Sequence, residues 1–381
     1  MSRSLITKSG QSSWRVATSN VEAFVTQTGG QLGPVSFRLG DKIVQPFSIA
    51  PWAEEKSTPP LPPILKALRG DFFCLPFGAN AIRFKGEQHP LHGETANARW
   101  RWASARDGEL HLRLDLKTRP GRVDKYISLR PNETTVYQRH IITGLSGPMS
   151  LGHHAMLKFP ATEGSGLISC SRFLRGHVAP LAFENPAERG YFSLRTGGKF
   201  RSLTKVPLAG GGFTDLSRYP ARPGFEDLVL LESDQRPPFA WTAVTFLTEG
   251  YVWFALKDPR VLRQTIFWLS NGGRHYAPWN GRHTNVLGLE EVTAFFHYGL
   301  AESAAKNALT VKGQATCRQF QANQPVTVNY IIAVAPIPRG FDRVKAIIPA
   351  ADSQSVQLIS RSNRKICAGI DLKFLGVTDL K

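Results

Sequence analysis

The sequence predicts an all-β fold with two large antiparallel sheets, and two observations support this prediction. Many short segments alternate apolar and polar residues, as half-buried strands do. In addition, 34 glycines and 26 prolines, neither with a repeating period, supply frequent turns. Residues 110–116, LHLRLDL, alternate almost perfectly, and residues 123–129 and 134–142 follow with a turn between them. Together these segments predict an antiparallel meander of the kind that forms large sandwiches.

The length and composition indicate one folded domain. A chain of 381 residues is long enough for one large all-β domain or two ordinary ones. Its hydrophobic content of 42% and charged content of 20% are typical of a globular protein. No linker-like stretch separates the C-terminal strand pattern from the rest. We therefore expect a loose polar tail over residues 1–13 and a single domain over residues 14–381.

The formal net charge of +18 raises the question of a nucleic-acid or membrane partner. Lysines and arginines are scattered along the chain, with no run of five or six, and no nucleic-acid-binding motif occurs. There is also no apolar run of 18 residues that could cross a membrane. We therefore expect neither partner, and interpret the charge as a basic surface or a preference for an acidic substrate.

The N-terminus and the cysteines indicate the compartment. The first residues, MSRSLITKSGQSSWRV, contain no apolar core of a signal peptide. The four cysteines are widely spaced, without a C-x-x-C pair, and predict reduced, mostly buried thiols: Cys74, Cys170, Cys317 and Cys367. We therefore expect a cytoplasmic protein, and the sequence leaves its oligomeric state open.

Residues 75–100, LPFGANAIRFKGEQHPLHGETANARW, mix hydrogen-bonding and aromatic side chains. Asn80 follows a glycine turn, Arg83 comes three residues later, and His92 lies within Leu-His-Gly-Glu. Such side chains suit a sugar, whose hydroxyl groups need donors and acceptors and whose C–H faces pack on aromatic rings. The same composition also fits an ordinary polar loop with a satisfied histidine.

Two later strands carry further candidate groups. His153 and His154 are adjacent, so only one of them can face a given site. Glu290 lies within the apolar strand at residues 286–292, where a charge is costly unless it is paired or needed. Glu291 should face the other way. The polar and aromatic loop at residues 271–283 precedes this strand, and functional residues often lie on such loops.

The order of these motifs resembles the aldose 1-epimerase (galactose mutarotase-like) superfamily over most of residues 14–375. The matching features are Gly-x-Asn, the Leu-His-Gly turn followed by Trp, a histidine on a strand, and a Trp-containing loop before a Gly-Leu-Glu strand. The resemblance implies a β-supersandwich with a sugar cleft on a concave face. It also implies interconversion of the α and β anomers of an aldose or a related sugar derivative.

The resemblance implies a role for individual residues. His154 would give a proton to the ring oxygen, Glu290 would take the proton of the C1 hydroxyl, and His92 would hydrogen-bond the ring. The substrate would be bound by Asn80, Arg83, Asp215 and Trp279, with Trp52 as an alternative stacking residue. No metal or organic cofactor is expected, since the sequence has no H-E-x-x-H motif and no zinc-ligand spacing.

Two departures from the family pattern leave other functions open. The family's Asn-Arg pair is Asn80-Ala81 here, and its Leu-His-Gly-Gly turn ends in Glu94. A non-catalytic carbohydrate-binding protein is therefore an alternative, as is a lyase or hydrolase acting on oligosaccharides. The sequence does not indicate which sugar is bound.

Overall fold

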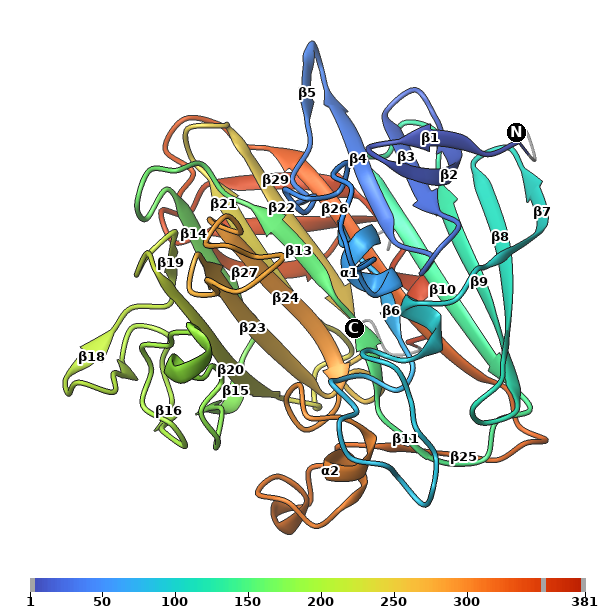
Figure 1. Cartoon of the computed structure of the whole chain (residues 1–381). Helices are drawn as coiled ribbons and strands as arrows, with labels where there is room; N and C mark the ends of the chain where they lie inside the picture. The colour runs from blue at the N-terminus through green and yellow to red at the C-terminus, as the bar shows by residue number, and fades with distance from the viewer. Residues whose placement is uncertain (1–3, 351–353, 378–381) are drawn as a thin grey trace.

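The computed structural model describes residues 4–350 and 354–377. Within these ranges the chain is almost entirely β structure, with two short α-helices, α1 (Pro63–Ala67) and α2 (Leu300–Ala304). None of the described helices is long and apolar enough to span a membrane. The predicted all-β class with large antiparallel sheets is confirmed (Figure 1).

Two large antiparallel sheets form the body of the molecule. The nine-stranded sheet has the order β19 (Arg218–Tyr219), β14 (Gly166–Cys170), β21 (Ala240–Phe246), β22 (Tyr251–Lys257), β26 (Val326–Pro336), β10 (Thr135–Thr143), β9 (Gly121–Leu129), β8 (Glu109–Leu116), β7 (Arg101–Arg106). The eight-stranded sheet has the order β16 (Lys199–Phe200), β15 (Phe173–Val178), β20 (Phe225–Ser233), β23 (Gln264–Asn271), β24 (Val286–Thr293), β12 (Leu151–His153), β6 (Phe73–Cys74), with β13 (Ala155–Lys158) also pairing with β24. The meander predicted from residues 110–142 corresponds to β8, β9 and β10.

Smaller sheets flank this body. The N-terminal sheet has the order β1 (Ile6–Lys8), β2 (Gln11–Ala17), β3 (Val21–Thr26), β4 (Leu32–Leu39), β5 (Lys42–Val44). The C-terminal sheet contains β27 (Val344–Pro349), β28 (Ser355–Ser360), β29 (Lys365–Gly369). Two-stranded pairs join β11 (Gly147–Met149) to β25 (Arg318–Phe320), and β17 (Val206–Pro207) to β18 (Phe213–Thr214).

The N-terminal segment differs from the loose tail expected over residues 1–13. Ile6 pairs with Ser13 and Lys8 with Gln11, so β1 and β2 form a hairpin. All three residues of β1 are exposed. The strand therefore lacks the apolar alternation by which sequence patterns are recognised. Residues 1–3 of the expected tail lie outside the described residues.

The eight-stranded sheet is buried on both faces, and this positions the site. Val229 and Leu231 of β20 point into the sandwich between the two large sheets. Leu228 and Leu230 of the same strand point to the opposite face, where they join a second apolar cluster with Trp52. Because side chains alternate along a strand, loops must cover this outer face.

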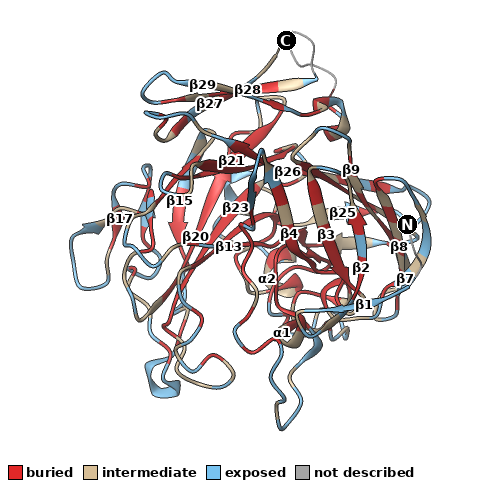
Figure 2. Ribbon diagram, turned by 90° about the horizontal axis from the view of Figure 1, so that it is seen from above, coloured by how far each residue is buried: buried red, intermediate tan, exposed pale blue. Residues whose placement is uncertain are grey.

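The C-terminal sheet covers part of the nine-stranded sheet. Ile347, Val356 and Leu358 share one apolar cluster with Trp241 and Ile331. Figure 2 shows β27–β29 as a layer on the side of β21 and β26 that faces away from β20 and β23. The molecule therefore has a third layer behind the sandwich.

The described chain contains no disulfide bond. All four cysteines are free, as predicted. Cys74 is buried, Cys170 and Cys317 are half-buried, and Cys367 is exposed, so the expected burial does not hold for all four.

Adjacent residues of one strand face opposite sides, as predicted for Glu290 and Glu291. Glu291 points into the sandwich and forms an ion pair with Lys257 of β22. Its Oε2 also accepts a hydrogen bond of 2.7 Å from Thr265 Oγ1.

His153 faces the same interior, where its Nδ1 lies 2.8 Å from Asp71 Oδ2. His154 is therefore the histidine that faces the outer side.

We expect Lys257→Met to lower the free energy of unfolding by about 3–5 kcal/mol, because it leaves the Glu291 charge buried without a compensating cation. The double variant Lys257→Met/Glu291→Leu should lose much less, since both charges are removed. Urea denaturation of the two proteins measures the difference. A double variant as unstable as the single one would show that the ion pair is not what holds the sheets together here.

Candidate functional site

A cavity of about 380 Å³ opens on the outer face of the eight-stranded sheet. Its wall is mostly apolar and aromatic, with Phe72, Phe183, Trp268 and Trp279 among the lining residues. The strands supply the floor, and loops that cover the outer face supply the sides. Small-molecule sites commonly combine such an apolar wall with a few polar groups.

Three histidines are among the polar groups that line the cavity: His92, His154 and His297. The ring of His92 lies 5.0 Å from that of His154 and 5.4 Å from that of His297, between centroids. Phe72 stacks on His154 with centroids 4.6 Å apart. Three imidazoles from three separate segments therefore meet at one end of the cavity.

Glu290 lies beneath these histidines and is fully buried, with 0% of its surface exposed. Its Oε2 accepts a hydrogen bond of 2.5 Å from His297 Nε2. Its Oε1 lies 3.2 Å from His154 Nε2 and has no hydrogen-bond partner. One carboxyl group is thus shared by two imidazoles, with one oxygen still able to accept a proton.

Burial shifts the titration of these groups toward their neutral forms. It raises the pKa of Glu290 to about 7, although the neighbouring His154 opposes the shift. Burial lowers the pKa of His154 and His297. It also places the pKa of His92 well below its ordinary value, with His154 adding to the effect. Burial therefore favours the neutral imidazoles, whereas the Glu290 carboxylate favours the protonated form of His154 beside it.

The Leu-His-Gly turn fixes the orientation of His92. Its Nδ1 accepts a hydrogen bond of 3.3 Å from the N–H of Gly78, so the neutral ring carries its proton on Nε2. His92 and Gly93 have positive φ values of 57° and 78°. A Cβ atom at Gly93 would lie 2.0 Å from the carbonyl oxygen of Leu75, so only glycine fits.

Arg274 is a cavity residue that sequence analysis did not select, although the loop at residues 271–283 was singled out. Its guanidinium group lies 4.5 Å from the ring centroid of Trp279 and 5.3 Å from that of Trp268. Its Nε donates a hydrogen bond of 2.7 Å to Glu184. The loop therefore contributes a cation held against aromatic rings, a favourable arrangement in a partly dry site.

A second buried carboxyl group lies behind this loop. Glu226 accepts hydrogen bonds from Trp268 Nε1 and Ser270 Oγ, both at 2.9 Å. Burial raises its pKa to about 7, and Arg274 opposes the shift. Glu226 does not line the cavity, and it holds the Trp268 ring in place.

The structure brings together four of the seven site residues predicted from the sequence. His92, His154 and Trp279 line the cavity, and Glu290 lies directly behind the histidines. Trp52, the alternative stacking residue, is buried behind Trp279 in an edge-to-face contact.

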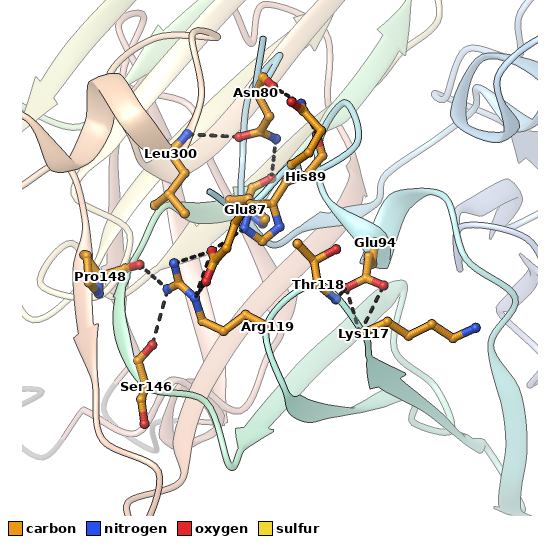
Figure 3. Close-up of polar contacts among 12 residues, drawn as sticks. Asn80, Glu87, His89, Glu94, Lys117, Thr118, Arg119, Ser146, Pro148 and Leu300 are labelled. Atoms are coloured by element: carbon orange, nitrogen blue, oxygen red, sulfur yellow. Dashed lines mark hydrogen bonds and ion pairs between the residues drawn. The ribbon is translucent and has the colours of Figure 1, made fainter. Parts of the chain in front are cut away.

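Asn80 is near His92 in sequence but does not line the cavity. Its Nδ2 donates to the carbonyl oxygens of Gly78 and Pro90 at 3.0 and 2.9 Å, and its Oδ1 accepts from the N–H of Leu300 at 2.9 Å. The amide group of Asn80 therefore makes its hydrogen bonds to the backbone, and its role is to hold two loops together (Figure 3).

Arg83, Asp215 and Glu94 also lie away from the cavity lining. Arg83 is exposed. Asp215 accepts hydrogen bonds from the N–H and hydroxyl groups of Ser217. Glu94, the departure from the family's turn, accepts from the backbone N–H groups of residues 117 and 118 (Figure 3). The extra carboxylate thus faces β8 and its following turn, not the histidines.

His297 was missed because it belongs to none of the three family motifs. It follows Glu290 by seven residues, and the chain turns back after β24 so that its ring returns to the carboxyl group. The available signal was the run Phe295-Phe296-His297-Tyr298, an aromatic segment with one polar group directly after the strand that carries Glu290.

Among the described residues, His154, Glu290 and His297 form a group whose possible metal-ligand atoms lie within 4.8 Å of one another. Two imidazoles and a carboxylate suit zinc and similar metals. However, Nε2 of His297 already donates to Glu290 at 2.5 Å. Nδ1 of His154 has no hydrogen-bond partner, whereas a metal-bound histidine normally donates from its second nitrogen. The arrangement therefore fits proton transfer better than metal ligation.

We expect Asn80→Ala to lower the free energy of unfolding by about 1–3 kcal/mol, because it leaves buried backbone groups without partners. Arg83→Gln is the matched control and should change stability by less than about 0.5 kcal/mol, since that side chain is exposed. Urea denaturation measures both. Equal effects of the two variants would contradict the structural role of Asn80.

Solved structures share this architecture. The protein described as "Putative aldose 1-epimerase" from Escherichia coli K12 matches with a TM-score of 0.59 and 12% identity, over 86% of this chain and 100% of that chain. The galactose mutarotase related enzyme from Lactobacillus acidophilus matches with a TM-score of 0.57 and 10% identity, over 86% and 98% of the two chains. A galactose mutarotase-like protein from Lactobacillus casei matches with a TM-score of 0.55 and 10% identity, over 84% and 99%.

Comparison at the level of sequence adds nothing further. No model of a known protein family and no curated protein matches the chain. At 10–12% identity, a likeness in structure establishes the fold and leaves the activity to be argued from the site. The fold that the sequence motifs predicted is confirmed: the chain has the galactose mutarotase-like fold.

Proposed function

We propose that the protein binds an aldose or a related sugar derivative and interconverts its α and β anomers by general acid/base catalysis. One observation carries this proposal. A buried carboxyl group with a pKa of about 7 contacts two imidazoles at one end of an aromatic cavity. A carboxylate that contacts imidazoles orients their rings and stabilises the imidazolium that forms when one of them takes up a proton.

The cavity is suited to a monosaccharide. Its volume of about 380 Å³ lies within the usual range for small-molecule sites. The rings of Trp268 and Trp279 offer apolar faces to the C–H groups of a sugar. The Nε2–H of His92 and the guanidinium of Arg274 are donors for its oxygen atoms.

The proposed reaction opens and recloses the sugar ring. His297, supported by Glu290, removes the proton from the C1 hydroxyl. The protonated form of His154, which the Glu290 carboxylate 3.2 Å away favours, gives a proton to the ring oxygen. The bond between C1 and the ring oxygen breaks, and C1 becomes an aldehyde carbon. Rotation about the C1–C2 bond and the reverse proton transfers then give the other anomer. One proton is taken up and one released, so the sum of the steps needs no metal or organic cofactor.

Glu290 acts through His297 in this proposal, because its own surface is fully covered. The imidazole donates Nε2–H to the carboxylate at 2.5 Å, which leaves Nδ1 as the accepting atom. A carboxylate in this position orients the ring and stabilises the imidazolium that forms. Glu290 therefore supplies the negative charge, and His297 touches the substrate.

The complete burial of Glu290 also favours a second candidate function, that of a carbohydrate-binding protein without catalysis. If His297 does not take up the proton, a fully buried Glu290 cannot reach a bound sugar. The cavity would then serve for binding alone, with Glu290 as a structural acceptor for the histidines.

Proton NMR exchange between anomers, measured across a panel of aldoses, tests the proposal. We expect the wild-type protein to accelerate exchange for at least one sugar, and Glu290→Gln to reduce the acceleration by about 10²–10⁴-fold. Glu163→Gln, a change to an exposed carboxylate outside the cavity, should have no effect.

Tryptophan fluorescence during sugar titration separates the two candidate functions, since Trp268 and Trp279 line the cavity. Binding that persists in Glu290→Gln while exchange is lost supports catalysis. Sugar binding without any acceleration of exchange in the wild-type protein would favour the binding function and contradict the epimerase.

A further inference from the structure

A second cavity, of about 240 Å³, lies between the nine-stranded sheet and the C-terminal sheet. Its lining residues come from β14, the start of β15, the loop after β16, the residue before β19, β27 with the residue before it, and the turn after β28. It shares no lining residue with the histidine cavity. The proposed sugar chemistry therefore does not account for it.

Four basic side chains line this second cavity, and no carboxylate does: Arg201, Arg343, Lys345 and Arg361. Within residues 4–350 and 354–377, the side chains of Arg201, Lys345 and Arg361 form no ion pair. Elsewhere the chain pairs comparable groups, as in Arg236 with Asp234 at 2.6 Å. The lining of the cavity therefore carries positive charge without an ion pair, and the carboxylates that act on it, Asp215 and Asp342, lie outside the lining.

Two polar atoms at the cavity are buried without a hydrogen-bond partner, Ser169 Oγ and Arg343 Nε. Ser169 is only 8% exposed. It pairs with Ala243 across the ladder of β14 and β21, so it faces the C-terminal sheet as Ala243 does. Buried polar groups are rarely left unpaired, because the loss of water is costly. Both atoms carry a hydrogen that no described acceptor uses.

The nearest carboxylates are already occupied. Asp215 accepts the N–H and Oγ–H of Ser217, and Asp342 accepts the N–H of Ser362 at 2.9 Å. Arg343 is held by a hydrogen bond of 3.1 Å from Nη2 to the carbonyl oxygen of Ser217. Burial lowers the pKa of Arg343, and the nearby positive charge of Arg361 lowers it further.

We propose that this cavity binds a phosphate-type oxyanion, either inorganic phosphate or the phosphate group of a small phosphate monoester. Guanidinium groups match the oxygens of phosphate in charge and in geometry. Ser202 and Thr204 also line the cavity, and their hydroxyl groups hydrogen-bond to each other at 2.8 Å, so that one hydroxyl hydrogen of the pair remains as a further donor. The volume corresponds to about eight water molecules, which is room for a phosphate group and a few attached atoms.

Binding would join two layers of the molecule. Ser169 and Arg201 belong to the strands and loops of the sandwich, whereas Arg343 and Arg361 belong to the C-terminal sheet and its turns. An anion between them would remove the repulsion among the arginines. It would also stabilise the folded state, because it binds only when the two layers are together.

Isothermal titration calorimetry of the full chain at low ionic strength tests this site, with inorganic phosphate and glycerol 3-phosphate as separate probes. We expect saturable binding of at least one probe to the wild-type protein. Arg361→Gln and Ser169→Ala should each weaken it, Arg361→Gln by about tenfold or more, since hydrogen bonds from charged groups are the strong ones. The probe that binds more tightly identifies the source of the phosphate group.

The control is Arg38→Gln, which removes an exposed arginine that does not line the cavity. It should bind like the wild-type protein, and Arg361 is itself exposed, so its replacement should leave the fold intact. Circular dichroism checks the fold of each variant. The proposal is overturned if neither probe binds, or if Arg361→Gln and Arg38→Gln weaken binding equally.

Discussion

The site depends on where β24 places two adjacent carboxyl groups, because a buried carboxylate is costly unless it is paired. Glu291 turns into the sandwich and meets the ammonium group of Lys257. Glu290 turns toward the cavity and meets only imidazoles. A neutral imidazole offers an N–H group but no compensating charge, and burial therefore raises the pKa of Glu290 to about 7. One strand thus supplies both a structural ion pair and a buried carboxyl group that contacts two histidines of the cavity.

The site residues are divided between strands and loops, because the outer face of the eight-stranded sheet is buried beneath loops. Glu290 and Trp268 lie on its strands, and His154 follows β12 directly. His92, Arg274 and His297 come from loops that close over that face. Groups on a packed sheet are held more rigidly than groups on loops. The sheet therefore carries the carboxyl group, and the loops carry side chains that are held by their own contacts. Gly78 N–H holds His92, Glu184 holds Arg274, and Glu290 holds His297.

Sequence patterns were informative where the evidence was local. Alternation identified the meander, and Glu290 stood out because a charge interrupts an apolar strand. Asn80 has the residue type of a sugar ligand, but its amide is used by backbone groups far away in sequence, such as the N–H of Leu300. His297 and Arg274 reach the cavity through turns whose direction no local pattern specifies. The alternation of apolar and polar residues therefore predicted the strands. The way in which the loops fold over the sheet and bring their side chains into the cavity could be seen only in the structure.

The most direct test of this account is a ¹³C NMR titration of the side-chain carboxyl group of Glu290, assigned by comparison with Glu290→Gln. A carboxyl group buried between two neutral imidazoles should titrate with a pKa of about 7. A midpoint near the ordinary value of 4.5 in the wild-type protein would contradict the account.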